Sequence, residues 1–379
     1  MKPTVAITAG DTNGVGYEVI IKSLLTGYMF EIMRPVIYGN AQVARKHIQT
    51  LDEEYHNVTW NMIDDVSQAK DGRLNLITCY TDDLPVQFGV STPESNKAAR
   101  ASLERACRDL REGKVQALLT APINKEALNN SKFKIQNSKL TMGHTEYLEE
   151  QFRGERREAR GESLMMLCSG GLRVALVCNH VSIADIPAQI TEERILAKLT
   201  MLNESLKRDF AIEKPRIAVL ALNPHAGDGG LLGKEEQEII VPAIEKAKAQ
   251  GIWAFGPYAA DGFFGSGHFE HFDGVLAMYH DQGLAPFKTL DMSGVNYTAG
   301  LRIVRTSPDH GTGYDIAGKN LADPSSMRNA IYLLVDVLRT RAEYDELRKN
   351  PLPFIERDDK EGRPRREFMD FKTTTWKEN

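Results

Sequence analysis

Short runs of β-forming apolar residues alternate with helical patterns along almost the whole chain, and this alternation constrains the fold most. Strand candidates occupy residues 5–8, 35–38, 58–63, 74–78, 115–120, 163–168, 173–177, 216–221, 275–278 and 301–304. Helical patterns begin near residue 18 and cover residues 96–111, 191–210, 235–250 and 325–345. Strands that alternate with helices are typical of layered α/β proteins, so we expect an α/β fold.

The clearest helical pattern covers residues 191–210. Thr191 stands where a hydroxyl can cap the first turn. Ile195, Leu199 and Leu202 recur at helical spacing and form an apolar stripe. This helix is therefore expected to pack one face on the core.

Composition and charge limit the class of protein. The 379 residues suffice for two domains or one large domain, and 42% of them are hydrophobic. The net charge of −5 offers no basic excess for nucleic acid or an anionic membrane. No apolar run approaches the roughly 20 residues of a membrane span, and no signal peptide is evident. We expect a cytoplasmic protein with four buried free thiols, at Cys79, Cys107, Cys168 and Cys178.

Two common nucleotide-binding signatures are absent. The glycine-rich turn at residues 10–16 follows a strand and precedes a helix, but its spacing is not G-x-G-x-x-G. Gly233 and Lys234 resemble the end of a P-loop, but Asp228 stands where that loop needs glycine. The sequence therefore supports neither a standard Rossmann site nor a Walker ATPase.

Three histidines, His180, His225 and His280, each follow a predicted strand. Loops at the carboxyl ends of strands are where α/β folds build their sites, and imidazole is a common ligand of divalent metals. Asp261 and Asp281 are candidates to orient these histidines or to act as bases. The separations of 45 and 55 residues match no local metal motif, so spacing alone leaves open three unrelated histidines.

A second group of residues suits an anion. His144 and Thr145 stand at a predicted helix start, where backbone N–H groups and a hydroxyl can bind phosphate. Lys288 and Arg305 add positive charge, and Asn296 adds an amide. Each residue alone is better explained as a helix cap or a surface charge.

Turn-forming residues crowd the segment 310–324, HGTGYDIAGKNLADP, between a predicted strand and the long helix at 325–345. So many turn-forming residues between a strand and a helix give a loop with a fixed shape. Such a loop suits an adenosine, although a simple connection would explain it too.

Taken together, these stretches resemble the 4-hydroxythreonine-4-phosphate dehydrogenase family. The resemblance rests on seven motifs in order: GDTNGVGYE, LLTAPINK, GHTEYL, CNHVSIADIP, LNPHAGDGG, YHDQGLAPFK and RTSPDHGTGYDIAGK. It runs from about residue 4 to about residue 335. The loop at 310–324 is also similar to the NAD-binding loop of isopropylmalate and isocitrate dehydrogenases. The resemblance therefore implies their two-domain α/β/α layered fold, with the active site in the interdomain cleft.

The resemblance also implies a domain division and a set of site residues. Residues 1–135 and 300–345 would form a domain with the NAD loop, residues 136–299 a second domain with the metal ligands and dimer interface, and residues 346–379 a charged tail. The implied metal ligands are His180, His225 and His280, shared across a homodimer. The implied substrate contacts are His144, Thr145, Lys288, Asn296 and Arg305. The implied catalytic residues are Asp261, Asp281 and Lys288. The implied cofactor contacts are His310, Gly311, Asp315, Ala317, Gly318 and Asn320.

The reaction that the resemblance implies is an NAD-dependent oxidation and decarboxylation of 4-phosphooxy-L-threonine to 3-amino-2-oxopropyl phosphate, in pyridoxal phosphate synthesis. The divalent metal would be zinc, or magnesium, manganese or cobalt, and NADP is an alternative to NAD. The nearest alternative substrate is D-threonate or D-erythronate 4-phosphate. A phosphate acyltransferase and a non-catalytic metal-binding protein are alternatives of other classes.

The sequence departs from the family pattern in three places. The first motif usually reads GDPAGIGPE, whereas this chain has Thr12, Asn13 and Tyr17 in place of Pro, Ala and Pro. The segment 51–73 and the tail after Lys349 look longer than usual. These departures leave the predicted metal and substrate residues intact, but they leave a shifted substrate preference open.

Overall fold

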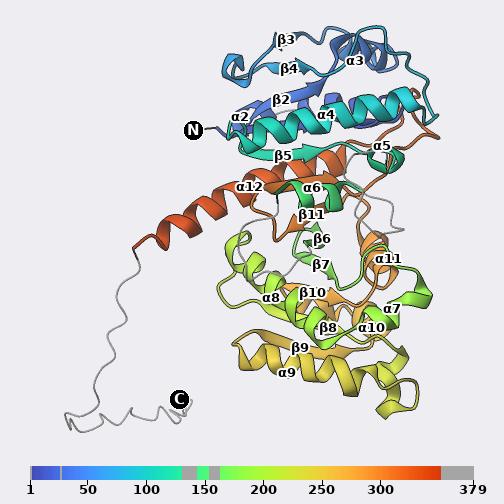
Figure 1. Cartoon of the computed structure of the whole chain (residues 1–379), viewed down its shortest axis with the longest axis vertical. Coiled ribbons are helices and arrows are strands. Elements are labelled where there is room, and N and C mark those ends of the chain that lie inside the picture. Colours follow the sequence, from blue (N-terminus) through green and yellow to red (C-terminus); the bar gives the residue numbers. More distant parts are fainter. Residues whose placement is uncertain (1, 26–27, 130–142, 153–162, 351–379) are drawn as a thin grey trace, which may run out of the picture.

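Twelve strands form one sheet in the computed structural model, which describes residues 2–25, 28–129, 143–152 and 163–350. The strand order is β3-β4-β2-β1-β5-β12-β11-β6-β7-β10-β8-β9, and the strands follow one another along the longest axis of the molecule (Figure 1). The bounds are β1 (Thr4–Thr8), β2 (Arg34–Gly39), β3 (Trp60–Ile63), β4 (Leu74–Thr78), β5 (Ala117–Thr120), β6 (Leu164–Ser169), β7 (Leu172–Leu176), β8 (Arg216–Leu220), β9 (Trp253–Tyr258), β10 (Gly274–Ala277), β11 (Val295–Ala299) and β12 (Val304–Pro308). The predicted α/β class is confirmed.

Helices separate most of these strands in the sequence. Their bounds are α1 (Gly16–Leu25), α2 (Met29–Ile32), α3 (Ala41–Ile48), α4 (Pro93–Arg111), α5 (Glu126–Asn129), α6 (His144–Phe152), α7 (Ile186–Gln189), α8 (Glu192–Arg208), α9 (Val241–Ala249), α10 (Ala260–Gly265), α11 (His280–Leu290) and α12 (Ser325–Leu347). Thr191 caps α8 as predicted, because its side chain accepts a hydrogen bond from the Arg194 backbone N–H. Among the described residues, every helix is too short or too polar to span a membrane.

The sheet consists of two parallel blocks that run in opposite directions. Strands β3, β4, β2, β1, β5 and β12 are parallel, and so are β7, β10, β8 and β9. Between the blocks, the pairs β12/β11, β11/β6 and β6/β7 are antiparallel. Because three antiparallel pairs lie between the blocks, the second block runs opposite to the first. Strands β7, β10 and β8 are parallel within it, so their carboxyl ends lie at one edge of the sheet.

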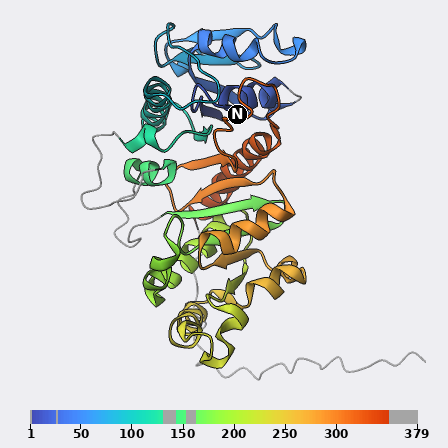
Figure 2. The same ribbon diagram turned by 90° about the vertical axis from the view of Figure 1, so that its right-hand side faces the viewer.

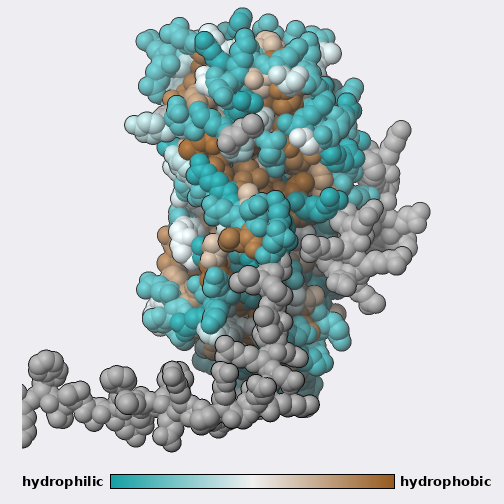
Figure 3. Space-filling view, turned by 90° about the vertical axis from the view of Figure 1, so that its left-hand side faces the viewer, coloured by the Kyte–Doolittle hydropathy of each residue, from teal (hydrophilic) through white to brown (hydrophobic). Residues whose placement is uncertain are grey.

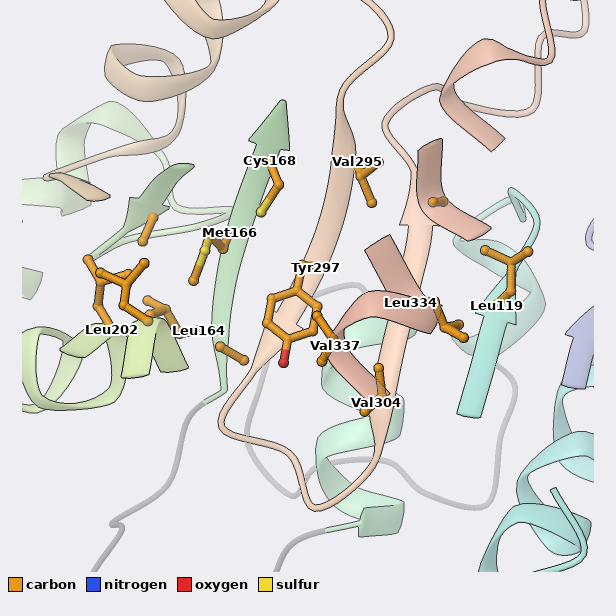
Figure 4. Close-up of a cluster of buried hydrophobic side chains, with 14 of the residues drawn as sticks. Leu119, Leu164, Met166, Cys168, Leu202, Val295, Tyr297, Val304, Leu334 and Val337 are labelled. Carbon is orange, nitrogen blue, oxygen red and sulfur yellow. The ribbon is translucent and has the colours of Figure 1, made fainter. Parts of the chain in front are cut away.

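Helices cover both faces of the sheet. On one face, α1, α8 and α12 pack on the largest apolar cluster. Figure 4 shows Leu334 and Val337 of α12 beside Tyr297 and Val304 of the central strands. Helices α4, α6, α10 and α11 contribute to apolar clusters on the other face. Figure 2 shows α12, in red, crossing the middle of the molecule, and the face in Figure 3 is mainly hydrophilic with hydrophobic residues grouped in its middle.

Some predicted elements are wrong or were missed. Of the strand predicted at 301–304, only Val304 is in a strand, because the chain bends at residues 302–303 and β12 begins at Val304. Strands β9 and β11 were not predicted. The helix predicted at 235–250 contains a π-helical turn at Glu236–Ile240 before α9 begins. The cysteines are free as expected, although Cys79 is only partly buried.

The predicted domain division remains a prediction. Its boundary at residue 135 and most of the predicted tail, residues 351–379, lie outside the described residues. The segment 51–73, which is longer than usual in the family pattern, contains β3 at the outer edge of the sheet.

Candidate active site

The three candidate metal histidines follow three neighbouring strands. His180 follows β7, His280 follows β10 and His225 follows β8, and these strands lie side by side in the order β7-β10-β8. The three strands are parallel, so their carboxyl ends meet at one edge of the sheet. The prediction that the histidines stand at strand ends is confirmed.

His180 and His280 lie close together at this edge. Their ring centroids are 5.6 Å apart. Nδ1 of His280 lies 2.6 Å from Oδ1 of Asp281, and Nδ1 of His180 lies 3.8 Å from Oε1 of Glu146. A carboxylate beside Nδ1 is the usual arrangement around metal-binding histidines, because it orients the ring and leaves Nε2 for the metal.

His225 lies in a separate, left-handed turn. Five consecutive residues from His225 to Gly229 have positive φ angles, including 51° at His225. The buried carboxylate of Glu236 fixes the start of this turn: its Oε1 accepts hydrogen bonds from the backbone N–H groups of Leu222 and Asn223 at 2.8 and 2.7 Å. Non-glycine residues rarely adopt this conformation, and such strain often marks functional segments.

Two of the three histidines therefore fit a metal site within one chain. In the part of the chain that the structure describes, no group of three His, Cys, Asp or Glu side chains is close enough to hold a metal ion. His180 and His280 supply two imidazoles of suitable chemistry, and further donors would have to come from His225 after a movement, from substrate or from another subunit. This donor set is consistent with a metal but incomplete in one chain.

Arg305 is a buried cation on β12. Its side chain is only 2% exposed, and its guanidinium donates hydrogen bonds to the hydroxyls of Thr120 and Thr298 at 2.7 to 3.1 Å. None of the described carboxylates lies within 4 Å of it. Burial lowers the pKa of Arg305 to about 10, and the negative charge of Glu146, which is not within ion-pair distance, partly opposes this shift, so Arg305 stays charged at neutral pH. A buried charge without a counter-ion is costly, which favours an anionic ligand here.

Two further polar side chains near Arg305 each have a buried atom without a hydrogen-bond partner. Nε2 of His144, the first residue of α6, and Oδ1 of Asn296 on β11 are buried without a hydrogen bond in the structure. Burial and the nearby Arg305 hold the pKa of His144 well below its usual range, so the ring is neutral. Asn296 lies two residues before Thr298 on the same strand, hence on the face of Arg305. Thr145 is the second residue of α6.

Lys288 forms an ion pair near the end of α11. Its Nζ lies 3.3 Å from Oδ2 of Asp309 and donates a hydrogen bond to the backbone oxygen of Asp309 at 3.2 Å. The Asp309 side chain is 8% exposed. Burial raises the pKa of Asp309, and the positive charge of Lys288 opposes this shift. Asp309 follows β12 directly and leads into the loop at 310–324.

The two predicted catalytic aspartates are far more exposed. Asp261 lies in the first turn of α10 and is exposed. The Asp281 side chain is 84% exposed, and its contact is with His280. The structure thus places Asp281 beside a candidate metal ligand, whereas Asp261 makes no hydrogen bond or ion pair with another candidate residue that the structure describes.

The loop at 310–324 packs on the glycine-rich turn of residues 10–16. The Val15 backbone N–H donates to the Thr312 oxygen at 2.9 Å, and the Tyr314 hydroxyl donates to the carboxylate of buried Asp11 at 2.7 Å. Gly318 has a φ of 73°, and a Cβ added there would lie 2.7 Å from the Phe88 ring.

The candidate cofactor residues differ in exposure. His310, Gly311 and Asp315 are partly or fully exposed, and Ala317 is 5% exposed. His310 Nε2 and Asn320 Oδ1 are nevertheless buried and have no hydrogen-bond partner in the structure. Unpaired polar atoms along a shaped loop are consistent with a polar ligand that completes their hydrogen bonds.

Residues 31–334 match the family model of the pyridoxal phosphate biosynthetic protein PdxA. The chain belongs to the PdxA family. A relative from Bacteroides thetaiotaomicron, named 4-hydroxythreonine-4-phosphate dehydrogenase, is 50% identical over 352 residues, 93% of each chain. A relative from Oceanobacillus iheyensis, provisionally named D-threonate 4-phosphate dehydrogenase, is 39% identical over 90% of this chain and 99% of the relative. The crystal structure of 4-hydroxythreonine-4-phosphate dehydrogenase from Klebsiella pneumoniae has a TM-score of 0.75 at 34% identity, covering 89% of this chain and 98% of that one.

Two of the three departures from the PdxA motif, Asn13 and Tyr17, make side-chain contacts around the glycine-rich turn. The Asn13 amide donates to the Val90 oxygen at 2.8 Å, and its Oδ1 accepts from the Gln87 backbone N–H at 2.8 Å. The Tyr17 hydroxyl lies 2.5 Å from that of Tyr80. These side chains connect the turn to residues 80–90, whereas the Thr12 hydroxyl is buried without a partner.

Sequence reasoning missed several residues of this PdxA-family site. Glu146, Glu236, Asp309 and Tyr314 make the contacts described above, but none was singled out. Glu146 and Asp309 lie inside quoted motifs, next to predicted residues, so adjacency to a motif was the available signal. The role of Glu236 could not be predicted from its neighbours in the sequence, because its carboxylate binds the backbone of a turn 14 residues away.

Proposed function

We propose that this chain catalyses the NAD-dependent oxidation and decarboxylation of 4-phosphooxy-L-threonine to 3-amino-2-oxopropyl phosphate, a step of pyridoxal phosphate synthesis. The observation that carries the proposal is the buried Arg305, which has no carboxylate partner among the described residues, together with the unpaired polar atoms of His144 and Asn296. A dianionic phosphate would supply the missing counter-charge and accept hydrogen bonds from the Arg305 guanidinium and from Nε2–H of His144, and Asn296 would have to turn its NH2 group, rather than Oδ1, toward it. Membership of the PdxA family favours a dehydrogenase over a phosphate acyltransferase or a non-catalytic metal-binding protein.

In this proposal the chain's own residues orient the substrate. Arg305, Asn296 and the start of α6 at His144 and Thr145 hold the phosphate end, which fixes the rest of the molecule relative to the sheet edge. Neutral His144 donates or accepts a single hydrogen bond and adds no charge. Exposed Asp281 is the candidate to accept the hydroxyl proton, directly or through a water, with Asp261 as the second candidate.

Two absent groups would complete this site. His180, His225 and His280 would hold a divalent metal, zinc or one of magnesium, manganese and cobalt. The loop at 310–324 would hold NAD, or NADP, through His310, Gly311, Asp315, Ala317, Gly318 and Asn320. When bound, the metal polarises the substrate oxygen and the nicotinamide accepts the hydride.

The proposed assembly is a homodimer with shared sites. The support is the incomplete donor set: the described residues of one chain bring together only His180 and His280. Inactive His180→Ala, His225→Ala and His280→Ala variants should be mixed in all three pairs. If one histidine crosses the dimer, the two pairs that contain it should regain activity, whereas recovery in no pair would mean that the metal site is not shared.

The test of the reaction uses two substrates. NADH absorbance and trapped carbon dioxide should be measured with 4-phosphooxy-L-threonine and with D-threonate 4-phosphate. The hydroxyl on carbon 3 of 4-phosphooxy-L-threonine is β to the carboxylate, so one carbon dioxide should appear for each NADH. NADH without carbon dioxide would refute the mechanism.

The same measurement tests the second candidate function. The Oceanobacillus iheyensis relative favours D-threonate 4-phosphate as the alternative substrate. Only a few polar contacts separate an amine from a hydroxyl at carbon 2, so family membership alone does not set the preference. A clear preference for the threonate compound, or for D-erythronate 4-phosphate added as a third substrate, would reassign the chain.

A further inference from the structure

The ion pair between Lys288 and Asp309 joins the two parts of the candidate site. Lys288 lies eight residues after His280 on the same helix, α11. Asp309 lies four residues after Arg305 and one before His310, where β12 meets the loop at 310–324. The pair therefore connects the helix of the metal end with the strand of the phosphate end.

Asp309 is held in place independently of Lys288. Its backbone N–H donates to the Ser326 hydroxyl at 3.0 Å, and that hydroxyl donates to the Gly294 oxygen at 2.6 Å. Lys288 is the more exposed member of the pair, since its side chain is 37% exposed whereas that of Asp309 is 8% exposed. Asp309 receives the ammonium through one carboxylate oxygen and its own backbone oxygen, and these two acceptors together determine where the ammonium lies.

We propose that Asp309 is a positioning residue that holds the charged ammonium of Lys288 toward the reacting carbons, so that Lys288 serves as the proton donor after decarboxylation. This inference rests on the proposed function. When the bond between the carboxylate carbon and carbon 2 breaks, its electron pair stays on the substrate. An N–H bond of Lys288 then breaks as its proton forms the new C–H bond at carbon 2. The neutral amine regains a proton from water, and Asp309 stays ionised throughout.

The burial of Asp309 distinguishes it from the other two aspartates. Asp261 and Asp281 are exposed, so water screens their charges. The charged or titratable groups that act on Asp309 are Lys288 from α11, His280 at the start of that helix, and His310 from the loop. Lys288 alone of these is within ion-pair distance.

A double-mutant cycle tests whether Asp309 acts through Lys288. Asp309→Asn keeps the size and the backbone oxygen but removes the charge. It should lower kcat about tenfold or more, because positioned proton transfer contributes at least that much, while KM changes less than about threefold. If the inference holds, Lys288→Met with Asp309→Asn should be no slower than Lys288→Met alone. Multiplicative losses would overturn it. Asp309→Glu should restore part of the lost rate.

Asp65→Asn is the matched control. Asp65 forms a 2.7 Å ion pair with Lys114 on the surface, away from the candidate site, so kcat should not change. If the wild type prefers threonate 4-phosphate, the proposed substrate is wrong, and the cycle is run on that compound with the same expected pattern.

A second measurement needs no turnover. Brief acetylation with acetic anhydride, followed by peptide mass spectrometry, reports how accessible each lysine amine is. Lys288 should be modified several times faster in Asp309→Asn than in the wild type and in the Asp65→Asn control. An unchanged rate at Lys288 would show that Asp309 does not hold it, whatever the enzyme's substrate.

Discussion

The hydroxyl of Tyr314 donates a 2.7 Å hydrogen bond to the carboxylate of Asp11, although 303 positions separate the two residues in the sequence. Asp11 is fully buried, and its other oxygen accepts the Asn13 backbone N–H at 2.9 Å. The candidate NAD loop is thus fastened to the glycine-rich turn that follows β1. A contact of this kind fixes the shape of a loop before a ligand arrives.

Tyr314→Phe should weaken NAD binding without unfolding the protein. The substitution removes one hydrogen bond and leaves a buried carboxylate oxygen short of a donor, a loss of about 1–3 kcal/mol shared between stability and binding. We expect the Kd for NAD to rise about threefold to tenfold, and metal affinity to stay constant. Calorimetric titration measures both, and an unchanged Kd for NAD would mean that the loop does not depend on this contact.

Gly318→Ala should destabilise the chain more than Gly72→Ala. Both glycines have similar positive φ angles, 73° and 68°, so both substitutions carry the backbone cost of about 1–2 kcal/mol. Only at Gly318 does the new Cβ meet another group, the Phe88 ring at 2.7 Å, whereas open space surrounds Gly72. Urea unfolding should rank wild type, Gly72→Ala and Gly318→Ala in that order. Equal losses would show that Phe88 moves away freely.

The strands that carry the candidate phosphate-binding residues were the hardest to predict from the sequence. Strand β11 reads VNYTA and β12 reads VRTSP, without a continuous apolar run. Asn296, Thr298 and Arg305 interrupt the pattern because they line the site rather than the core. By contrast, β1 and β8 lie wholly or largely in the core and were predicted within one residue. The polar residues of the site therefore interrupt the apolar pattern from which strands are predicted.

The histidines could be predicted because parallel strands bring their carboxyl ends together, a property of topology rather than of local sequence. The contacts of Glu236 and Asp309 could not, because each depends on the path of a distant turn. The left-handed segment after Pro224 was equally inaccessible, since His225 and Ala226 have no local preference for positive φ.

His47 should make stability depend on pH. It is 1% exposed, its Nε2 lies 2.8 Å from the Thr12 oxygen, and burial lowers its pKa to about 4. The unfolded chain, with a histidine pKa of about 6.5, binds a proton more readily, so stability is complete above that pH and declines as pH falls toward 4. The decline approaches about 1.4 kcal/mol per pH unit. His47→Gln keeps a donor for Thr12, so its urea unfolding at pH 7.5 and 5.0 should differ less than that of wild type. An equal pH dependence in both proteins would exclude His47 as the source.

Arg305→Met should abolish phosphate binding without lowering the stability of the unliganded protein. Within the described ranges the buried guanidinium has only hydroxyl partners, so its removal relieves a charge without an ion pair. The unliganded variant should therefore be as stable as wild type, or more so. Inorganic phosphate should raise the Tm of wild type, because a ligand at 100 times its Kd adds about 2.7 kcal/mol.

The Arg305→Met variant should lose this phosphate effect, together with about a hundredfold or more of kcat/KM on the phosphorylated substrate, since a buried charged hydrogen bond is removed. Arg34→Met is the matched control: its guanidinium pairs with Asp71 at the surface, so the phosphate effect should persist. Thermal unfolding of wild type and both variants, with and without phosphate, measures the Tm rise that phosphate causes in each. An equal Tm rise in wild type and Arg305→Met would place the anion elsewhere and remove the observation on which the proposed function rests.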